Sequence, residues 1–319
     1  MRGFPLGVSD TIDPMNLKLF ASILFACAPV AIAQQSADSS PLDELVESAR
    51  VEIVGKNFVF TEGPLWHEGA LMICDLRASV IYRFTPGETP ATPETATALR
   101  AKSAATAGIC LNASGDLLCA QFSGKVTKAK DAGKIDEYEV IASESDAGPI
   151  KRANDIVVRS DGASYFTDFG AGNVLRIATD GKCTRVASGL KAPNGLTFSK
   201  DHRKLFVAEY GGMAVRVFDV QDDGTLSEPR EFAKLSGEEP GRPDGMKTDE
   251  NGNIYSTGPG GIWVFRESGE RIGVIPAPGA SNFCFGGADG KSLFITSGET
   301  VGVIRMRIRG ATTPAATTP

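Results

Sequence analysis

Histidine and the common catalytic motifs are scarce in this sequence. Its 319 residues include only two histidines, His67 and His202, and neither a Cys-x-x-Cys nor a His-Glu-x-x-His pattern. The composition therefore argues against a zinc site built from nitrogen and sulfur ligands. No Gly-x-Ser-x-Gly motif is present either, which argues against a serine hydrolase with a nucleophile elbow. The glycine-rich stretch 258–261 lacks the lysine of a phosphate-binding loop, so we interpret it as a hairpin turn.

Clusters of positive charge are missing as well. The 33 lysines and arginines are scattered along the chain and are outnumbered by 39 acidic residues, which gives a net charge of −6. Nucleic-acid-binding proteins carry a basic face or stripe, and anionic lipid surfaces attract clusters of basic residues. The sequence therefore predicts no nucleic acid and no membrane surface as a partner.

Only one long hydrophobic run is present, and it lies near the N-terminus. Residues 16–33 contain Lys18, then an apolar stretch shorter than the roughly 20 residues that span a bilayer, then Ala31-Ile32-Ala33 as a cleavage pattern. We predict a signal peptide over residues 1–33, with Met15 as the natural start because residues 1–14 carry acids and a proline. The expected location is the periplasm or outside the cell. A lipoprotein signal centred on Cys27 is the alternative.

Cysteine pairing stays open. After removal of the signal peptide five cysteines remain, and an odd number leaves at least one unpaired. Cys110 and Cys119 flank a predicted hairpin at 112–117 and could form a disulfide across it, which an oxidising compartment permits. The favoured interpretation is that the cysteines are small buried residues in separate strands.

A repeat of turn and strand signals runs through the rest of the chain. Asn154 stands seven residues before Asp161-Gly162, and Asp244 stands seven before Asn251-Gly252. The equivalent anchors, 38 to 50 residues apart, are Glu62, Ala107, Asn154, Asn194, Asp244 and Asn282. Such a period, with an apolar strand and an alternating strand in each unit, is typical of a β-propeller. We predict an all-β fold over residues 51–309, a six-bladed propeller with four-stranded antiparallel blades.

The flanking segments have separate predictions. Residues 34–50 read as an N-terminal tether followed by a short helix over Pro41–Arg50, with Ser40 as its cap. Val51–Val54 is expected to pair with the last blade and close the ring, because an open sheet edge invites aggregation. Residues 310–319 have little apolar surface to bury and are predicted to be disordered.

The anchors suggest a metal site. The innermost strand of each blade lines the channel of a propeller, so residues at one repeat phase form a ring around the axis. A single Asn or Asp before a strand is usually a turn residue, but four oxygen-bearing side chains at one phase favour a common role. Their oxygens suit a hard divalent cation, and their two carboxylates would balance its charge; the set is Glu62, Asn154, Asn194 and Asp244. We expect Ca²⁺, with Mg²⁺, Mn²⁺ and Zn²⁺ as alternatives.

Four motifs carry a family resemblance. They are Glu62-Gly63-Pro64-Leu65-Trp66, Arg152-Ala153-Asn154-Asp155, Pro193-Asn194-Gly195-Leu196 and Arg242-Pro243-Asp244-Gly245-Met246. Together they resemble the family of regucalcin (senescence marker protein), gluconolactonase and luciferin-regenerating enzyme, and specifically its bacterial gluconolactonase-type members. The resemblance implies one catalytic divalent cation held by Glu62, Asn194 and Asp244. It also implies that Asn154 contacts the metal or the substrate and that Arg152 contacts the substrate.

The reaction implied by this resemblance is hydrolysis of a lactone. We expect a secreted metal-dependent enzyme that opens a sugar lactone such as glucono-1,5-lactone, with Asp244 as the general base. Asp75, Asp168 and Glu209, which share a phase on the second strands, are expected to be hydrogen-bond partners rather than catalytic groups. Two alternatives remain: a hydrolase of other esters, acyl-lactones or phosphotriesters on the same scaffold, and a binding propeller whose metal is only structural.

Overall fold

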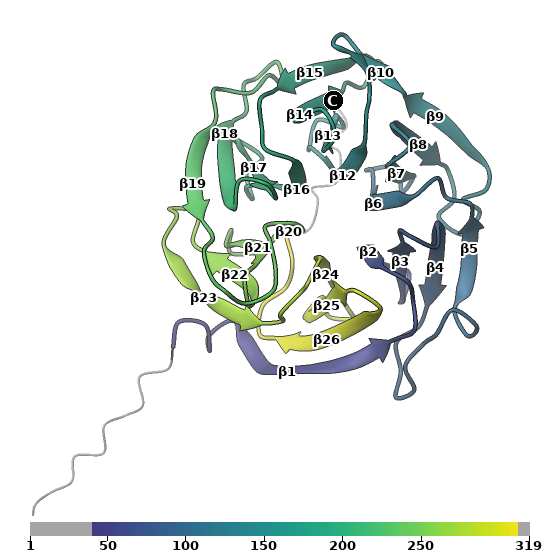
Figure 1. The fold of residues 1–319 in the computed structure, drawn as a ribbon, viewed down its shortest axis with the longest axis vertical. Helices are drawn as coiled ribbons and strands as arrows, with labels where there is room; N and C mark the ends of the chain where they lie inside the picture. The colour runs from purple at the N-terminus through teal and green to yellow at the C-terminus, as the bar shows by residue number, and fades with distance from the viewer. Residues whose placement is uncertain (1–39, 312–319) are drawn as a thin grey trace, which may run out of the picture. The chain divides into compact units, whose positions relative to one another are not determined.

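Residues 40–311 are described in a computed structural model of the protein. Within this range the chain forms strands and turns and no helix, so no helix there is long and apolar enough to cross a membrane (Figure 1). The predicted signal peptide lies outside the described residues, and so do residues 312–319. The predictions for those segments stay untested.

Six four-stranded antiparallel sheets surround a central axis, which confirms the six-bladed β-propeller (Figure 1). In each of the first five blades the strands follow chain order from the axis outward. Blades one to three consist of β2 (Thr61–His67), β3 (Ala70–Asp75), β4 (Val80–Phe84) and β5 (Thr97–Ala101); β6 (Thr106–Leu111), β7 (Leu117–Gln121), β8 (Lys125–Ala129) and β9 (Tyr138–Ala142); and β12 (Ala153–Val158), β13 (Ser164–Asp168), β14 (Asn173–Ile177) and β15 (Cys183–Ala187). Blades four to six consist of β16 (Pro193–Phe198), β17 (Lys204–Glu209), β18 (Ala214–Asp219) and β19 (Arg230–Lys234); β20 (Met246–Thr248), β21 (Ile254–Gly258), β22 (Gly261–Phe265) and β23 (Arg271–Pro276); and β24 (Asn282–Gly286), β25 (Ser292–Ser297), β26 (Thr300–Met306) and β1 (Val46–Gly55). A two-strand hairpin of β10 (Glu144–Ser145) and β11 (Gly148–Pro149) lies outside the blades.

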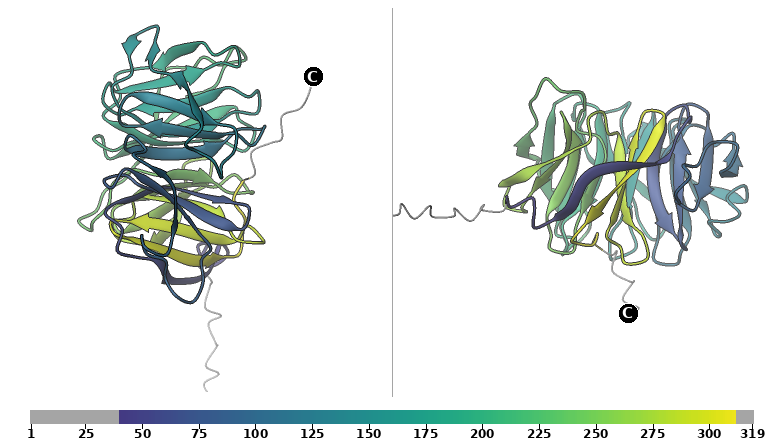
Figure 2. Two further views of the ribbon diagram at one scale, coloured as in Figure 1. Left: turned by 90° about the vertical axis from the view of Figure 1, so that its right-hand side faces the viewer. Right: turned by 90° about the horizontal axis from the view of Figure 1, so that it is seen from below.

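The first strand of the chain closes the ring. β1 pairs antiparallel with β26 and forms the outermost strand of blade six, as Figure 2 shows along the side of the molecule. The first and last blades are also joined at the start of β2, where the Thr61 hydroxyl hydrogen-bonds to the carbonyl oxygens of Gly298 and Thr300, at the turn between β25 and β26. The predicted closure by Val51–Val54 is confirmed.

Two boundary predictions differ from the structure. Residues 41–45 form turns and β1 begins at Val46, so the short helix predicted over Pro41–Arg50 is wrong. The sixth sheet lacks a fourth strand until this segment pairs with β26, and that long-range pairing outweighs local helix propensity. At the other end, Gly310 bridges to Asp249 and Ala311 donates a backbone hydrogen bond to Thr248. These two residues of the predicted disordered tail are therefore ordered.

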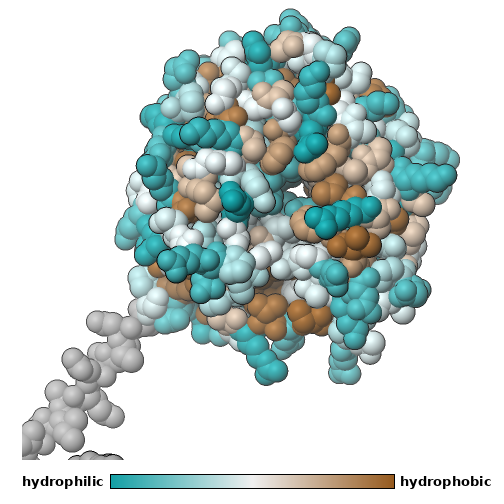
Figure 3. All heavy atoms as spheres, in the orientation of Figure 1, coloured by the Kyte–Doolittle hydropathy of each residue, from teal (hydrophilic) through white to brown (hydrophobic). Residues whose placement is uncertain are grey.

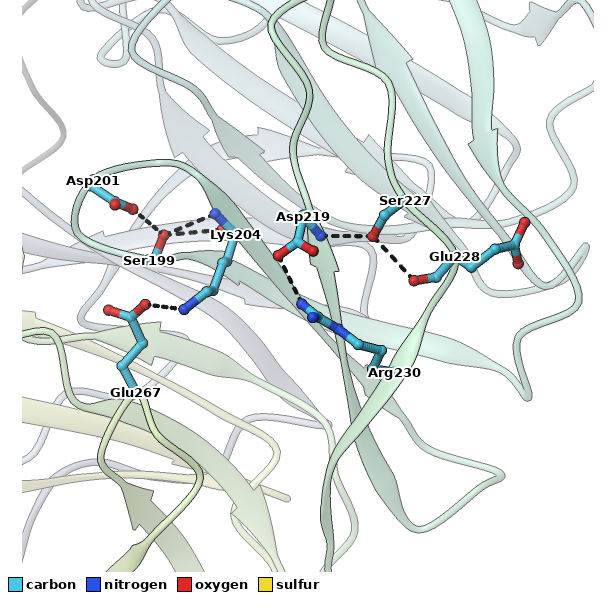
Figure 4. Close-up of polar contacts among 8 residues, drawn as sticks. All are labelled: Ser199, Asp201, Lys204, Asp219, Ser227, Glu228, Arg230 and Glu267. Atoms are coloured by element: carbon cyan, nitrogen blue, oxygen red, sulfur yellow. Dashed lines mark hydrogen bonds and ion pairs between the residues drawn. The ribbon is translucent and has the colours of Figure 1, made fainter.

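The hydrophobic core lies between the faces of neighbouring sheets. One cluster joins Leu118 and Val126 of blade two to Phe166 and Leu175 of blade three, and all four are buried. Hydrogen bonds and ion pairs supplement this hydrophobic packing, and Figure 4 shows several of them. Lys204 of blade four forms a 2.6 Å ion pair with Glu267, which follows β22 of blade five.

The described cysteines are all free thiols. In the β6–β7 ladder Cys110 lies opposite Leu118, whereas Cys119 lies opposite Ile109. The two cysteines therefore point to opposite faces of the sheet, and each packs in a different hydrophobic cluster. The disulfide is not formed, and the favoured interpretation, that the two cysteines occupy separate positions in different strands, fits the structure.

Candidate functional site

A pocket of about 190 Å³ lies where the innermost strands of the propeller begin. Its lining includes the four predicted ligands, Glu62, Asn154, Asn194 and Asp244, which come from blades one, three, four and five. Arg152, predicted to contact the substrate, also lines the pocket. Side chains up to 182 residues apart in sequence are thus brought to one place.

Bulges in the innermost strands accompany three of the four predicted ligand positions. The pairing with the second strand shifts between Glu62 and Leu65 in blade one, and equivalent shifts flank Asn154 in blade three and Asn194 in blade four. A bulge bends its strand and re-aims the side chain there. Blade five has no such shift, but its strand begins only at Met246, which leaves Asp244 on the preceding loop.

The sixth anchor, Asn282, does not line this pocket. It pairs regularly with Thr296, without a bulge. Its side-chain oxygen accepts a 2.9 Å hydrogen bond from the backbone N–H of Phe283. The repeat phase alone therefore does not decide which side chains face the pocket.

Glycines next to the ligands let adjacent blades approach closely. The backbone N–H of Gly195 donates a 2.9 Å hydrogen bond to the Asp244 carbonyl oxygen, and a Cβ on Gly195 would lie only 2.0 Å from that oxygen. Gly245 makes the equivalent contact with blade six: its N–H donates to the carbonyl of Ser281. These contacts hold the starts of the innermost strands together, and with them the ligand side chains.

Carboxylates at the ends of the second strands hold the loops that lead into the site. Asp168 accepts hydrogen bonds from the backbone N–H groups of Lys151 and Arg152, at 2.9 and 2.8 Å. Asp75 and Glu209 make corresponding contacts in blades one and four. As predicted, these three side chains are hydrogen-bond partners, and each one acts within its own blade.

The two carboxylates in the pocket carry unfavourable charge. Burial raises the pKa of Glu62 to about 7, and the nearby charge of Asp155 contributes to the rise. The pKa of Asp244 is also raised well above its usual range, first by burial and then by the charges of Glu62 and Asp155. The protein alone therefore does not favour the doubly ionised pair.

These residues fit a hard divalent cation. The side chains of Asn154, Asn194 and Asp244 make no hydrogen bond within residues 40–311, and these residues line the same pocket as Glu62. No group of three or more His, Cys, Asp or Glu side chains suited to a metal occurs in that range; the pocket instead offers two carboxylates and two carboxamides. A cation would satisfy these oxygens and offset the charge that raises both pKa values.

An apolar rim surrounds the ligand set. Phe60, Phe122, Phe169 and Tyr210 line the pocket and are half-buried. Figure 3 shows hydrophobic residues along one side of the central opening of this face. The Arg152 guanidinium lies 5.2 Å from the ring centroid of Phe122 and 5.9 Å from that of Phe169, within cation–π range.

Comparison with known proteins identifies the family. The model of the SMP-30/gluconolactonase/LRE-like region matches residues 60–299. The chain belongs to this family. It is 27% identical over 307 residues to a gluconolactonase from Zymomonas mobilis, an alignment that covers 85% of this chain and 86% of the relative.

Solved structures of family members share the fold. XC5397 from Xanthomonas campestris, described as a gluconolactonase, is 28% identical with a TM-score of 0.72 and covers 83% of this chain and 92% of its own. A regucalcin from Agrobacterium tumefaciens, described as a calcium-binding protein, has a TM-score of 0.67 at 16% identity and covers 86% of this chain and 97% of its own. At that identity the second likeness shows the fold alone.

The interpretation of the sequence missed Asp155, which lies beside the predicted ligands of this chain. Asp155 is 4% exposed, and its Oδ2 has no hydrogen-bond partner within the described residues. Burial raises the pKa of Asp155, and the positive charge of Lys247 offsets part of that rise. Lys247 also donates a 3.4 Å hydrogen bond to the side-chain oxygen of Asn282. A signal was available, because four of the six anchors are followed by glycine whereas Asn154 is followed by this acid.

The two histidines lie away from the pocket. His202 lines a separate cavity of about 300 Å³ and stacks on Phe198 at 5.1 Å between ring centroids. Its Nδ1 accepts a 3.0 Å hydrogen bond from the backbone N–H of Ser160. His67 ends β2 at the opposite end of that strand from Glu62. Neither histidine contributes to the candidate site.

Proposed function

We propose that this chain is a divalent-metal-dependent lactonase. The observation that carries the proposal is the convergence of two carboxylates and two carboxamides in one pocket of a family propeller. Relatives named gluconolactonase and lactonase support lactone hydrolysis as the reaction class, and a small-molecule lactone as the substrate.

The metal would be held by Glu62, Asn154, Asn194 and Asp244. When bound, a divalent cation polarises the lactone carbonyl and acidifies a water molecule. Oxygen-only donors favour Ca²⁺, which accepts several carboxylate and amide oxygens in flexible geometry; Mg²⁺, Mn²⁺ and Zn²⁺ are alternatives. Export to the periplasm or beyond belongs to the same proposal and is supported by the sequence of residues 16–33.

Each residue of the site has a distinct task in this proposal. Asp244 acts as the general base, because it is a carboxylate in the pocket and no group within residues 40–311 donates a hydrogen bond to it. Glu62 stays ionised, and its charge contributes to holding the cation. The carboxamides of Asn154 and Asn194 orient the lactone. Arg152 pairs with the carboxylate that forms as the ring opens.

The substrate class has two candidates. The sugar lactone predicted from the sequence is glucono-1,5-lactone, and one relative is named a gluconolactonase. The second candidate, a lactone or ester with an apolar substituent, is favoured by the half-buried aromatic residues around the pocket.

Metal-dependent acid release tests the proposal. The mature chain would be stripped of metal and supplied with glucono-1,5-lactone and δ-valerolactone, with Ca²⁺, Mg²⁺, Mn²⁺ or Zn²⁺ restored and spontaneous hydrolysis subtracted. Asp244→Ala should abolish turnover, whereas Asp222→Ala, which removes an exposed carboxylate outside the pocket, should not. Metal-independent turnover, or full activity in Asp244→Ala, would contradict the proposed site.

A further inference from the structure

The rim of the pocket is built from two repeat positions. One is the residue that follows the second strand of a blade, and in blades one to four all four residues at this position line the pocket. They are Leu76, Phe122, Phe169 and Tyr210. The other position lies two residues before each ligand anchor and contributes Phe60 and Arg152. The fold therefore concentrates large apolar side chains on the side of the pocket formed by blades one to four.

These side chains form a connected surface rather than isolated contacts. The ring centroids of Phe122 and Phe169 are 6.5 Å apart, and those of Phe169 and Tyr210 are 6.0 Å apart. Arginine side chains stack over the same rings: Arg152 lies over Phe122, and Arg242 lies 5.1 Å from the Tyr210 centroid. Each aromatic ring of this surface is half-buried, so part of it remains available to a ligand.

The pocket lining offers few polar groups that could hydrogen-bond to the hydroxyls of a substrate. Among its lining residues the polar side chains are the four ligand residues, Arg152 and Tyr210. If a cation occupies the predicted ligand residues, the pocket lining leaves only Arg152 and the Tyr210 hydroxyl for the rest of the substrate, and outside the lining Arg242 lies over the Tyr210 ring. A sugar lactone carries several hydroxyls, and covering hydroxyls with apolar side chains costs free energy when they find no partner. An alkyl or aryl group would instead gain from the same contact.

We propose that the rim selects lactones with an apolar alkyl or aryl substituent over polyhydroxylated sugar lactones. This inference rests on the proposed lactone hydrolysis and specifies its substrate class. The lactone ring lies toward the ligand residues, and the substituent packs against Phe122, Phe169 and Tyr210. Arg152, held over two of these rings, is placed beside the carboxylate that the reaction releases.

Three lactones with the same six-membered ring test the inference. They are δ-valerolactone, which has no substituent, δ-decalactone, which carries a pentyl chain, and glucono-1,5-lactone, which carries hydroxyls. Each fully buried methylene is worth about fourfold in kcat/KM. With about half of the pentyl surface covered, δ-decalactone should exceed δ-valerolactone about 30-fold, and glucono-1,5-lactone should fall below δ-decalactone.

Variants of the rim locate the source of that preference. Phe122→Ser and Phe169→Ser should each lower the ratio of kcat/KM for δ-decalactone to that for δ-valerolactone by at least about fivefold. Both residues are half-buried rather than core, and thermal unfolding and Ca²⁺ binding check that each variant is folded. Val140→Ser is the matched control, because Val140 is 49% exposed on the outer strand β9. It should leave the ratio unchanged.

The outcomes separate this inference from the function on which it rests. Preferred turnover of δ-decalactone that is lost in the rim variants supports it. Faster turnover of glucono-1,5-lactone, or a ratio that the rim variants do not change, overturns the selectivity while leaving lactone hydrolysis intact. Failure of the metal-loaded wild-type protein to hydrolyse any of the three lactones overturns the proposed function itself.

Discussion

Replacement of Gly195 by alanine should disturb both the fold and the candidate site. The added Cβ would lie 2.0 Å from the carbonyl oxygen of Asp244, whereas ordinary contact begins at 3.4 Å. The two inner strands must therefore separate by more than an ångström, which breaks the hydrogen bond from the Gly195 N–H to that oxygen.

The magnitude follows from these two effects. Loss of the hydrogen bond costs about 1 kcal/mol, and overpacking of a tight contact costs about 1–3 kcal/mol. Their sum of about 2–4 kcal/mol should lower Tm by about 4–8 °C in a domain of this size. Because Asp244 moves with its backbone, kcat/KM for a lactone should fall about 100-fold.

Thermal unfolding and lactone kinetics on the same preparations measure both consequences. Gly87→Ala is the control, since a Cβ on Gly87 meets nothing within 4 Å and its backbone is not in the left-handed region. That variant should keep Tm and activity. A Gly195→Ala protein with Tm within 1 °C of wild type (about 0.5 kcal/mol) and full activity would refute the reasoning.

Three further predictions concern other parts of the molecule. Asp168→Ala should raise KM about tenfold, since the loop of Arg152 loses the carboxylate that accepts its hydrogen bond. The Ca²⁺ affinity and the pH profile of kcat should stay unchanged. A changed pH profile would instead make Asp168 a catalytic group. Burial lowers the pKa of His202, so the folded state resists protonation and stability should decline as the pH falls below about 6.5. The decline in Tm from pH 8 to 5 should be smaller in His202→Gln, and an equal decline would refute this assignment. Reductant should not change Tm, because Cys110 and Cys119 lie on opposite faces of their sheet; a lower Tm in reductant would indicate a disulfide.

The blade pattern was predictable because its signals are local. Turn residues such as Gly162, Gly252 and Gly290 adopt positive φ angles of 88°, 86° and 72°, which glycine tolerates without strain. Each turn precedes an apolar strand, so the period could be counted directly in the sequence. The extent of β1 was harder to predict from the sequence, because this strand forms by pairing with β26, about 250 residues later.

The convergence of the four predicted ligands in one pocket could be predicted for the same reason, whereas the aromatic side chains around them could not. Propeller geometry places one repeat phase around the axis, and this brought Glu62 and Asp244 together correctly. Asn282 shares the phase but does not line the pocket. Its strand pairs without a bulge at that position, and a bulge depends on the pairing of two strands rather than on the identity of one residue. The aromatic rim was not identified, since it combines two further phases whose orientation became evident only in the folded blades.

Calcium titration into the metal-stripped mature protein tests the central claim most directly. Isothermal titration calorimetry should show one saturable Ca²⁺ site, which Asp244→Asn weakens strongly and which Asp222→Asn leaves intact. Lactone turnover should appear in proportion to the occupancy of that site. Absence of saturable binding, or equal binding in Asp244→Asn, would contradict a metal centre formed by these four side chains.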